Sequence, residues 1–318
     1  MNIRLRFAVM FVVAGTLSGC SVHLDLGPLD LPSLSTSEVA RNNAAVCDSN
    51  ISQAVTKLSL DGQAATFAKS QSRTRLDVFG PVWRGWSGKI PEGGGRPPSL
   101  PPAPTTPAAL MKEAQRCVAQ ARVDSQVVSD VELARLLASA AAARSVEAAR
   151  LAKELSIPTE PVTANPATAL AYEREKKKYF SDTSEKPRLS AGVTQRRITT
   201  PPPGLVKALD QARYQLEWAA ARSNDAIADD YMSIAHKLQA QIQSLVEAGV
   251  SDDREPTYPV AGPSTAQKTL AGVLAQELEV VGSSSEDIAD DLPQLVGQIV
   301  AVQAKMGQAP APFPGLKP

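Results

Sequence analysis

Few residue types that do chemistry occur in the helical part of this sequence, and their spacing limits the reactions they could support. The chain has two histidines, His23 near its start and His236 within a long helical pattern. A di-metal centre in a helical bundle takes a glutamate three residues before each of its ligating histidines. Ser233 stands at that position before His236. The spacing therefore predicts no metal site, and it places His236 on the surface of its helix or partly buried beside Ile234 and Leu238.

Two acidic residues, Glu217 and Glu277, lie near apolar stripes of the helical pattern. They are either remnants of metal ligands or surface residues that flank the stripes. A hydrolase triad would need a serine on a strand-to-helix turn, and the sequence has no strand pattern that could supply one. Acidic residues on long helices are too common to indicate paired-carboxylate catalysis. We therefore expect a protein that is not an enzyme and has no cofactor.

Residues 1–19 have the order of an export signal. Arg4 and Arg6 precede an apolar run of 10 residues, which is short for a membrane span, and Leu17-Ser18-Gly19-Cys20 follows. This stretch resembles the lipobox of bacterial lipoproteins. The resemblance implies cleavage before Cys20, acyl chains such as palmitate on that residue, and an anchor on the extracytoplasmic face of the cell membrane. The alternative is an ordinary secretory signal with a chance cysteine.

The remaining cysteines, Cys47 and Cys117, both fall on apolar helix faces. Because an exported protein meets an oxidising compartment, we predict a disulfide between them. It would close a loop of about 70 residues and stabilise the fold by roughly 4 kcal/mol in the chain-entropy model. Two buried free thiols are the alternative. A metal site at this pair is not expected, since no further histidine or cysteine clusters with it.

Composition and charge indicate an Ala-rich helical protein with proline-rich connections. Aromatic residues make up 4% of the chain, prolines number 25, and the net charge is 0, which falls to −2 when residues 1–19 are removed. This balance gives no basic field for nucleic acid. After a tether at residues 20–34, the helical bundle is expected at 35–308, and a Pro-rich tail at 309–318.

Four long helices are expected, because apolar residues recur at steps of three and four. Their ranges are about 35–60, 106–155, 201–249 and 264–307. Capping boxes at Ser35 and Ser264 and the pair Thr106-Pro107 mark three of the starts. The fold class is therefore all-α, an antiparallel four-helix bundle. The alternative is that the helices break, near Ser223 and Gly282 among other points, into a compact bundle of six or seven.

Two flexible insertions are predicted between these helices, at about 61–106 and 157–202. The first holds Gly93-Gly94-Gly95, which lacks the flanking residues of a phosphate loop, and the two tryptophans Trp83 and Trp86. The tryptophans either pack back on the bundle or contact a partner. The second insertion holds the charge run 173–178, which is read as a solvated surface or as a contact with anionic lipid headgroups.

The segment from Leu209 to Val281 is similar to the ferritin-like domain of unknown function in actinobacterial exported proteins. The likeness is carried by Ile234-Ala235-His236-Lys237, by Leu245 to Val250, and by Glu255 to Val260. Residues 136–142 also look like a helix of such proteins. The resemblance implies a ferritin-type four-helix bundle and names no activity.

The sequence as a whole favours a membrane-anchored envelope lipoprotein with a non-catalytic structural or interaction role. Its partners would be the membrane, through the Cys20 lipid, and an envelope protein, with no role for nucleic acid. A binding protein for an apolar envelope ligand held between the helices is the second hypothesis. A degenerate ferritin-like metal or redox protein is the third.

Overall fold

The computed structural model describes residues 35–85, 100–158, 203–259, 265–281 and 292–316. The helices in these ranges are α1 (Thr36–Lys57), α2 (Gln63–Phe79), α3 (Pro107–Val127), α4 (Val131–Leu155), α6 (Leu205–Ala220), α7 (Asp225–Glu247), α8 (Thr265–Val280) and α10 (Leu292–Lys305). Within the described ranges all regular secondary structure is helical, which confirms the prediction of an all-α protein.

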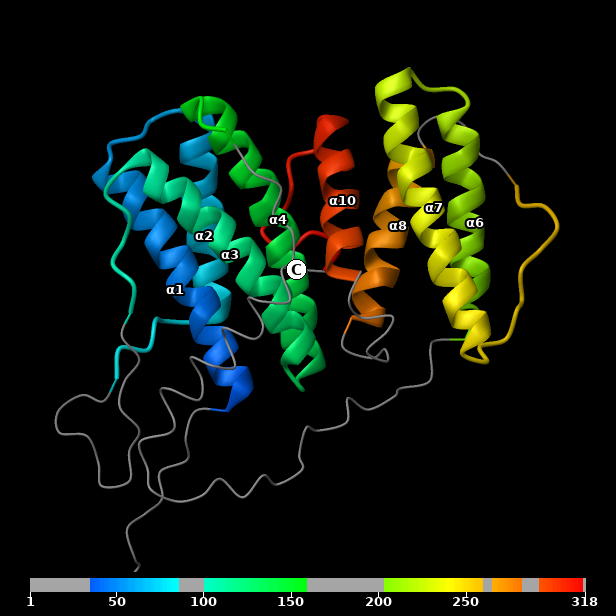
Figure 1. Ribbon diagram of the computed structural model, residues 1–318, viewed down its shortest axis with the longest axis horizontal. Helices are drawn as coiled ribbons and strands as arrows, with labels where there is room; N and C mark the ends of the chain where they lie inside the picture. Colours follow the sequence, from blue (N-terminus) through cyan, green and yellow to red (C-terminus); the bar gives the residue numbers. More distant parts are fainter. Residues whose placement is uncertain (1–34, 86–99, 159–202, 260–264, 282–291, 317–318) are drawn as a thin grey trace, which may run out of the picture.

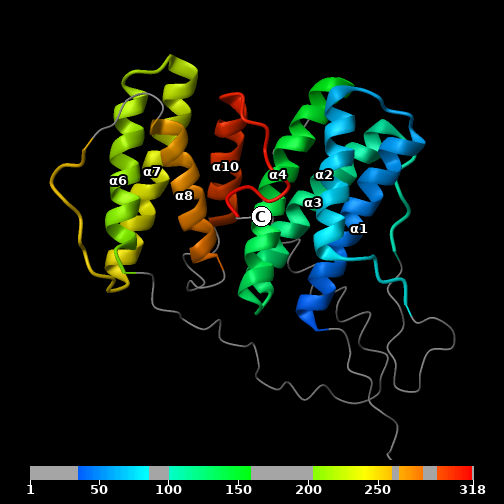
Figure 2. The ribbon, with the colours of Figure 1, turned by 180° about the vertical axis from the view of Figure 1, so that it is seen from behind.

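The described helices pack as two groups of four (Figure 1). The first group, called the first ring from here on, consists of α1 to α4, and α1 and α4 each pack against both α2 and α3. The second group, called the second ring, consists of α6, α7, α8 and α10, and α6 and α10 each pack against both α7 and α8. Helix α10 also packs along α4, and both views show it standing between α4 and α8 (Figure 1, Figure 2). The α4–α10 contact joins the two rings, and one apolar core cluster contains buried residues from both, while a second cluster lies within the first ring.

The prediction of four long helices was wrong, because two of them reverse direction midway. The chain leaves its helix at Val128, and the Asp130 carboxylate accepts the Leu133 N–H at 3.1 Å to begin α4. Asn224 caps α7 in the same way, as the sequence allowed. The apolar register continues through both breaks, so the pattern alone does not reveal them. Reversal lets α3 pack on α4 and α6 on α7 as helical hairpins.

The predicted flexible insertion at 61–106 was wrong for Gln63–Phe79, which is helix α2. The buried stripe of this helix contains Ser72 and Arg75 as well as apolar residues. Because this stripe includes an arginine, the sequence pattern does not indicate an apolar helix face. The glycines and prolines that follow α2 in the sequence indicate a loop instead. After α2 the chain stays close to the first ring, since the partly buried Trp83 donates its backbone N–H to the Asn42 Oδ1 at 2.7 Å.

Several predicted helix ends are confirmed. The Ser35 and Glu38 side chains form the reciprocal capping box of α1, and the Thr106 hydroxyl accepts the Ala109 N–H at 3.2 Å to cap α3. Gly249 has φ +88° just after α7, a conformation that favours glycine. Leu292 begins α10, and Pro293 lies in its first turn.

The C-terminal segment, predicted as a Pro-rich tail, lies against both rings. The Phe313 ring meets the Phe79 ring edge to face with centroids 5.6 Å apart, and the Ser139 hydroxyl donates to the Pro314 carbonyl at 2.7 Å. Ser139 lies in the alanine-rich run of α4, where every alanine from Ala138 to Ala143 is fully buried. Small side chains at these positions let the neighbouring backbone approach α4 closely.

Other predictions fall outside the described residues: the export signal, the tether, Trp86, residues 159–202, the Ser264 cap and Gly282. Among the helices that are described, none is both long enough and apolar enough to cross a membrane.

Candidate functional site

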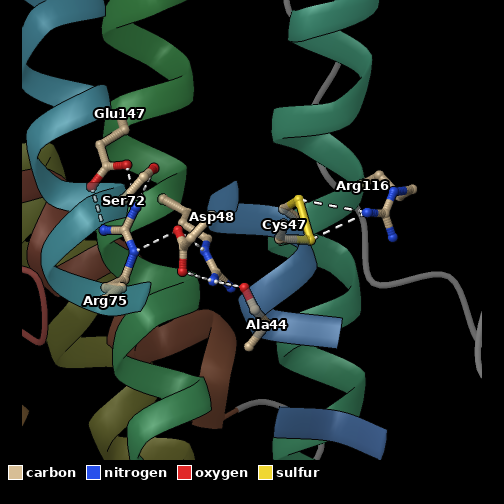
Figure 3. A network of polar contacts seen from close by, with 9 residues as sticks. Ala44, Cys47, Asp48, Ser72, Arg75, Arg116 and Glu147 are labelled. Atoms are coloured by element: carbon tan, nitrogen blue, oxygen red, sulfur yellow. Dashed lines mark hydrogen bonds and ion pairs between the residues drawn. A yellow bond between two sulfur atoms is a disulfide. The ribbon is translucent and has the colours of Figure 1, made fainter. Parts of the chain in front are cut away.

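The interior of the first ring holds a cluster of four charged side chains. Figure 3 shows three of them, Asp48 from α1, Arg75 from α2 and Glu147 from α4, and the fourth is Arg144 of α4. The Arg75 guanidinium donates to both Glu147 oxygens, at 2.6 and 2.7 Å, and its Nε donates to Asp48 at 3.0 Å. Arg144 donates to the other Asp48 oxygen at 2.5 Å and to the Ala44 carbonyl at 3.1 Å. Two cations face two anions, so the cluster has no net charge.

The surroundings of Arg75 favour the charged form of its guanidinium. Burial acts to lower the pKa of the Arg75 guanidinium, but the Asp48 and Glu147 carboxylates outweigh it and raise the pKa above its ordinary value. Arg144 also lies over the Phe79 ring, 5.8 Å from its centroid. All four side chains are at most 3% exposed. A substrate in solution therefore cannot reach them, and their chemistry is mutual pairing.

A fifth ionisable group, Asp124 of α3, lies in the same ring. Gln120 and Asn43 donate to its two oxygens at 2.9 and 3.4 Å. Burial nevertheless raises the pKa of Asp124 to about 7, because these bonds and the charges of Arg144 and Arg116 offset only part of the lost hydration.

The predicted disulfide between Cys47 and Cys117 is confirmed, and it joins α1 to α3 with the two Cα atoms 5.7 Å apart. Cys47 directly precedes Asp48, so the bridge fixes α1 beside the charged cluster (Figure 3). The Arg116 guanidinium lies 3.2 Å from the Cys47 sulfur and bonds the Glu113 carboxylate at 2.8 Å. Both sulfurs and Glu113 lie within 4.8 Å of one another, the only such cluster of metal-ligand types in the described residues. In the disulfide form neither sulfur is a thiolate, so this group does not act as a metal site.

The residues that carried the metal hypothesis are separated in the second ring. His236 is exposed, as predicted for a surface residue, and Ser233 accepts a hydrogen bond from Gln298 of α10 at 2.7 Å. Glu217 is half-buried and bonds Arg213 at 2.5 Å. Glu277 is neither a surface residue nor part of a ligand cluster within the described chain. It is fully buried, and Gln241 of α7 donates to it at 3.0 Å.

Comparisons with family models, with curated proteins and with solved structures found no match to this chain.

An open groove of about 660 Å³ lies between the N-terminal end of α2 and the C-terminal end of α4. Its walls carry Phe67, Arg150 and Lys153, and the Arg150 guanidinium lies over the Phe67 ring, 5.3 Å from its centroid. The carboxylate of Glu154 accepts the N–H groups of Ala64 and Ala65 at 2.7 and 3.1 Å. Because Glu154 caps α2 in this way, its negative charge is directed at the N-terminus of that helix.

Sequence reasoning found the disulfide and missed the charged cluster and the groove. Arg75 and Glu147 are 72 residues apart, and each belongs to a helix stripe that is otherwise built from small or apolar residues. The available signal was the position of Arg75 in line with Ala68, Ser72 and Phe79. An arginine at an inward position predicts an inward acid, although it does not say which one.

Proposed function

We propose that this protein is a lipid-anchored module of the cell envelope, held on the extracytoplasmic face of the membrane through Cys20, with a structural or interaction role and no catalytic one. The observation that carries the proposal is the pairing of the buried charges of the first ring with one another. Such a cluster specifies how helices pack, and its side chains are out of reach of a substrate. The disulfide beside it suits an exported protein.

The ferritin-like ancestry stays a prediction within this proposal. What supports it is that each ring contains four helices, two of them joined as a hairpin by a short turn. The segment with the resemblance, Leu209 to Val281, supplies three of the four helices of the second ring.

The anchor is tested by expressing the full chain and its Cys20→Ala variant in a bacterium that acylates lipoproteins. We expect the parent chain in the membrane fraction, with acyl chains on the N-terminal peptide by mass spectrometry. Cys20→Ala should lose both, and a Ser21→Ala control should keep them. An unacylated parent chain would overturn the anchor. Crosslinking on intact host cells then tests the interaction role. A membrane protein attached reproducibly to the parent and lost with Cys20→Ala supports it, and recovery of the monomer alone contradicts it.

A second function, the binding of an anionic amphiphile, is favoured by the groove between α2 and α4. An aromatic face and two cations fit a ligand with a carboxylate or phosphate head and an apolar body. This is the apolar-ligand hypothesis with a charge requirement added. The site is an open groove at helix ends, whereas the sequence suggested a site between the helices.

Titration calorimetry with a long-chain fatty acid tests this second function. We expect saturable binding that weakens at least tenfold in Arg150→Gln/Lys153→Gln and in Phe67→Ala. Lys112→Gln, a charge removal on the exposed face of α3, should have no effect. The fatty alcohol of equal length should bind more weakly than the acid. Equal binding of acid and alcohol, or an unchanged affinity in the double variant, would exclude the proposed role of the cations.

A further inference from the structure

The strongest unexplained feature of the molecule is the carboxyl group of Glu277. It projects from α8 into the interior of the second ring and is 0% exposed. Its hydrogen bond comes from the Gln241 side chain of α7, whose Nε2 donates to the Glu277 Oε2 at 3.0 Å. Helices α7 and α8 both pack against α6 and α10, so this contact crosses the ring from one side to the other.

Each side chain of this pair keeps one buried oxygen without a hydrogen-bond partner among the described residues, the Glu277 Oε1 and the Gln241 Oε1. Both atoms accept hydrogen bonds and neither donates when Glu277 is ionised. A buried acceptor without a partner is costly, and a buried charge without one costs more. A proton on Glu277 changes the chemistry of the pair. The acid O–H can donate to the amide oxygen while the amide N–H donates to the acid, which makes two reciprocal bonds.

The charged groups on the surrounding helices are engaged elsewhere. On α6, Arg213 bonds Asp210 and Glu217. On α10, Lys305 bonds Asp230 of α7. On α4, Arg135 bonds Glu132 and the backbone carbonyl of Glu279. The other ionisable residues of α7 and α8 whose side chains are described are Asp229, Tyr231, His236, Lys237, Glu247, Lys268 and Glu279.

Among the described residues, the Glu277 Oε2 bonds Gln241 and the Glu277 Oε1 has no partner, so neither oxygen bonds a cation. A cation that would stabilise the carboxylate is therefore missing from the described surroundings, and the proton is the remaining way to neutralise it.

We propose that Glu277 is a proton-dependent lock of the second ring: the folded ring holds it as a neutral carboxylic acid paired with Gln241, and ionisation loosens α8 from α7. Burial raises the pKa of Glu277 to about 7, and the Gln241 bond lowers it by less. A carboxyl whose pKa is raised by folding stabilises the fold fully below its unfolded pKa. The stabilisation is lost as the pH rises through the folded pKa. The window for Glu277 runs from about pH 4.5 to about pH 7.

If α8 moved, the contacts of the C-terminal segment with α8 would change as well. The backbone of Gly315 lies so close to Leu274 and Leu278 of α8 that a methyl group at Gly315 would meet their side chains at 2.6 and 2.7 Å. The same segment contacts α2 through Phe313 and α4 through Pro314. The position of α8 is therefore connected to the contact between the two rings.

The lock is tested by urea unfolding of the full chain at pH 5, 6, 7 and 8, followed by circular dichroism. For the parent we expect the unfolding equilibrium constant to rise on the order of 100-fold across this range from Glu277 alone. The isosteric Glu277→Gln, which stays neutral, should remove that part of the rise. Glu247→Gln, a change at an exposed carboxylate of α7, should keep it. Equal pH dependence in the parent and in Glu277→Gln would overturn the proposal.

A second measurement keeps the test valid if Glu277→Gln does not fold. In the parent chain labelled with ¹³C at glutamate carboxyls, one resonance should titrate near pH 7. Gln241→Leu should leave that midpoint well above the ordinary value, because burial is the main cause of the shift. It should destabilise the protein more at pH 5 than at pH 8, because only the neutral acid makes two bonds with Gln241. A parent spectrum in which every glutamate titrates below pH 5 would overturn the lock, since it would mean that water or a cation reaches Glu277.

Discussion

Arg75 of α2 and Glu147 of the neighbouring helix α4 face one another inside the first ring, with the two terminal nitrogens of the guanidinium bonded to the two carboxylate oxygens at 2.6 and 2.7 Å. The arrangement is bidentate and buried, which makes it geometrically specific as well as strong. It fixes α2 to α4 at one register, and Asp48 extends the same network to α1.

Removal of one partner of this pair should destabilise the protein strongly. In Arg75→Met the carboxylate of Glu147 is left buried without a counter-charge, and we expect a loss of about 3–5 kcal/mol in the free energy of unfolding. Arg75→Met/Glu147→Leu removes both charges and leaves Asp48 paired with Arg144, so it should lose less than Arg75→Met alone. Urea unfolding measures both variants, and a double variant as unstable as the single one would contradict this account.

The disulfide should contribute stability by restricting the unfolded chain. It joins residues 70 apart in sequence, so Cys47→Ser/Cys117→Ser should lower the free energy of unfolding by about 4 kcal/mol. Dithiothreitol should destabilise the parent by a similar amount and should leave the double variant unchanged. If dithiothreitol left the free energy of unfolding of the parent unchanged, the bridge would not form.

Asp124 should make the first ring more stable in acid than at neutral pH. Its pKa is raised to about 7 by burial, above an ordinary value of 3.8, so its stabilising effect is complete below about pH 4 and lost as the pH rises to 7. The loss should reach at most about 4 kcal/mol. Asp124→Asn should flatten this part of the pH profile of unfolding. The positive charges of Arg144 and Arg116 act in the opposite direction and lower the pKa of Asp124. A pH slope that is unchanged in Asp124→Asn would assign the effect to other groups.

Glu154 should stabilise α2 although it lies on α4. Its carboxylate accepts the first free N–H groups of α2, so Glu154→Ala should cost about 1 kcal/mol. Glu247→Ala removes an exposed carboxylate with no such role and serves as the control. A methyl group at Gly62 would come within 2.3 Å of the Glu154 carboxylate, so Gly62→Ala should also weaken the cap. Thermal unfolding by calorimetry measures all three, and equal effects of Glu154→Ala and Glu247→Ala would contradict the cap.

Local sequence determined the features that depend on neighbouring residues. The Ser35–Glu38 capping box, the Thr106 cap and the Gly249 stop are set by short-range hydrogen bonds and backbone preference, so they were readable in advance. The Cys47–Cys117 bridge was predictable for a related reason. Two cysteines on apolar faces had few other partners in a chain predicted to be exported.

Tertiary structure alone decided where the helices reverse, that α2 is a helix, and which charges meet. Burial of an arginine is favourable only when carboxylates from other helices surround it, and for Arg75 these come from residues 27 and 72 positions away. The burial of Glu277 could likewise not be predicted from the sequence. A glutamate near an apolar stripe reads as a surface residue, and it becomes a buried acid only because α6, α7 and α10 close around it. Periodicity reports which face of a helix turns inward, and the long-range packing determines what that face meets.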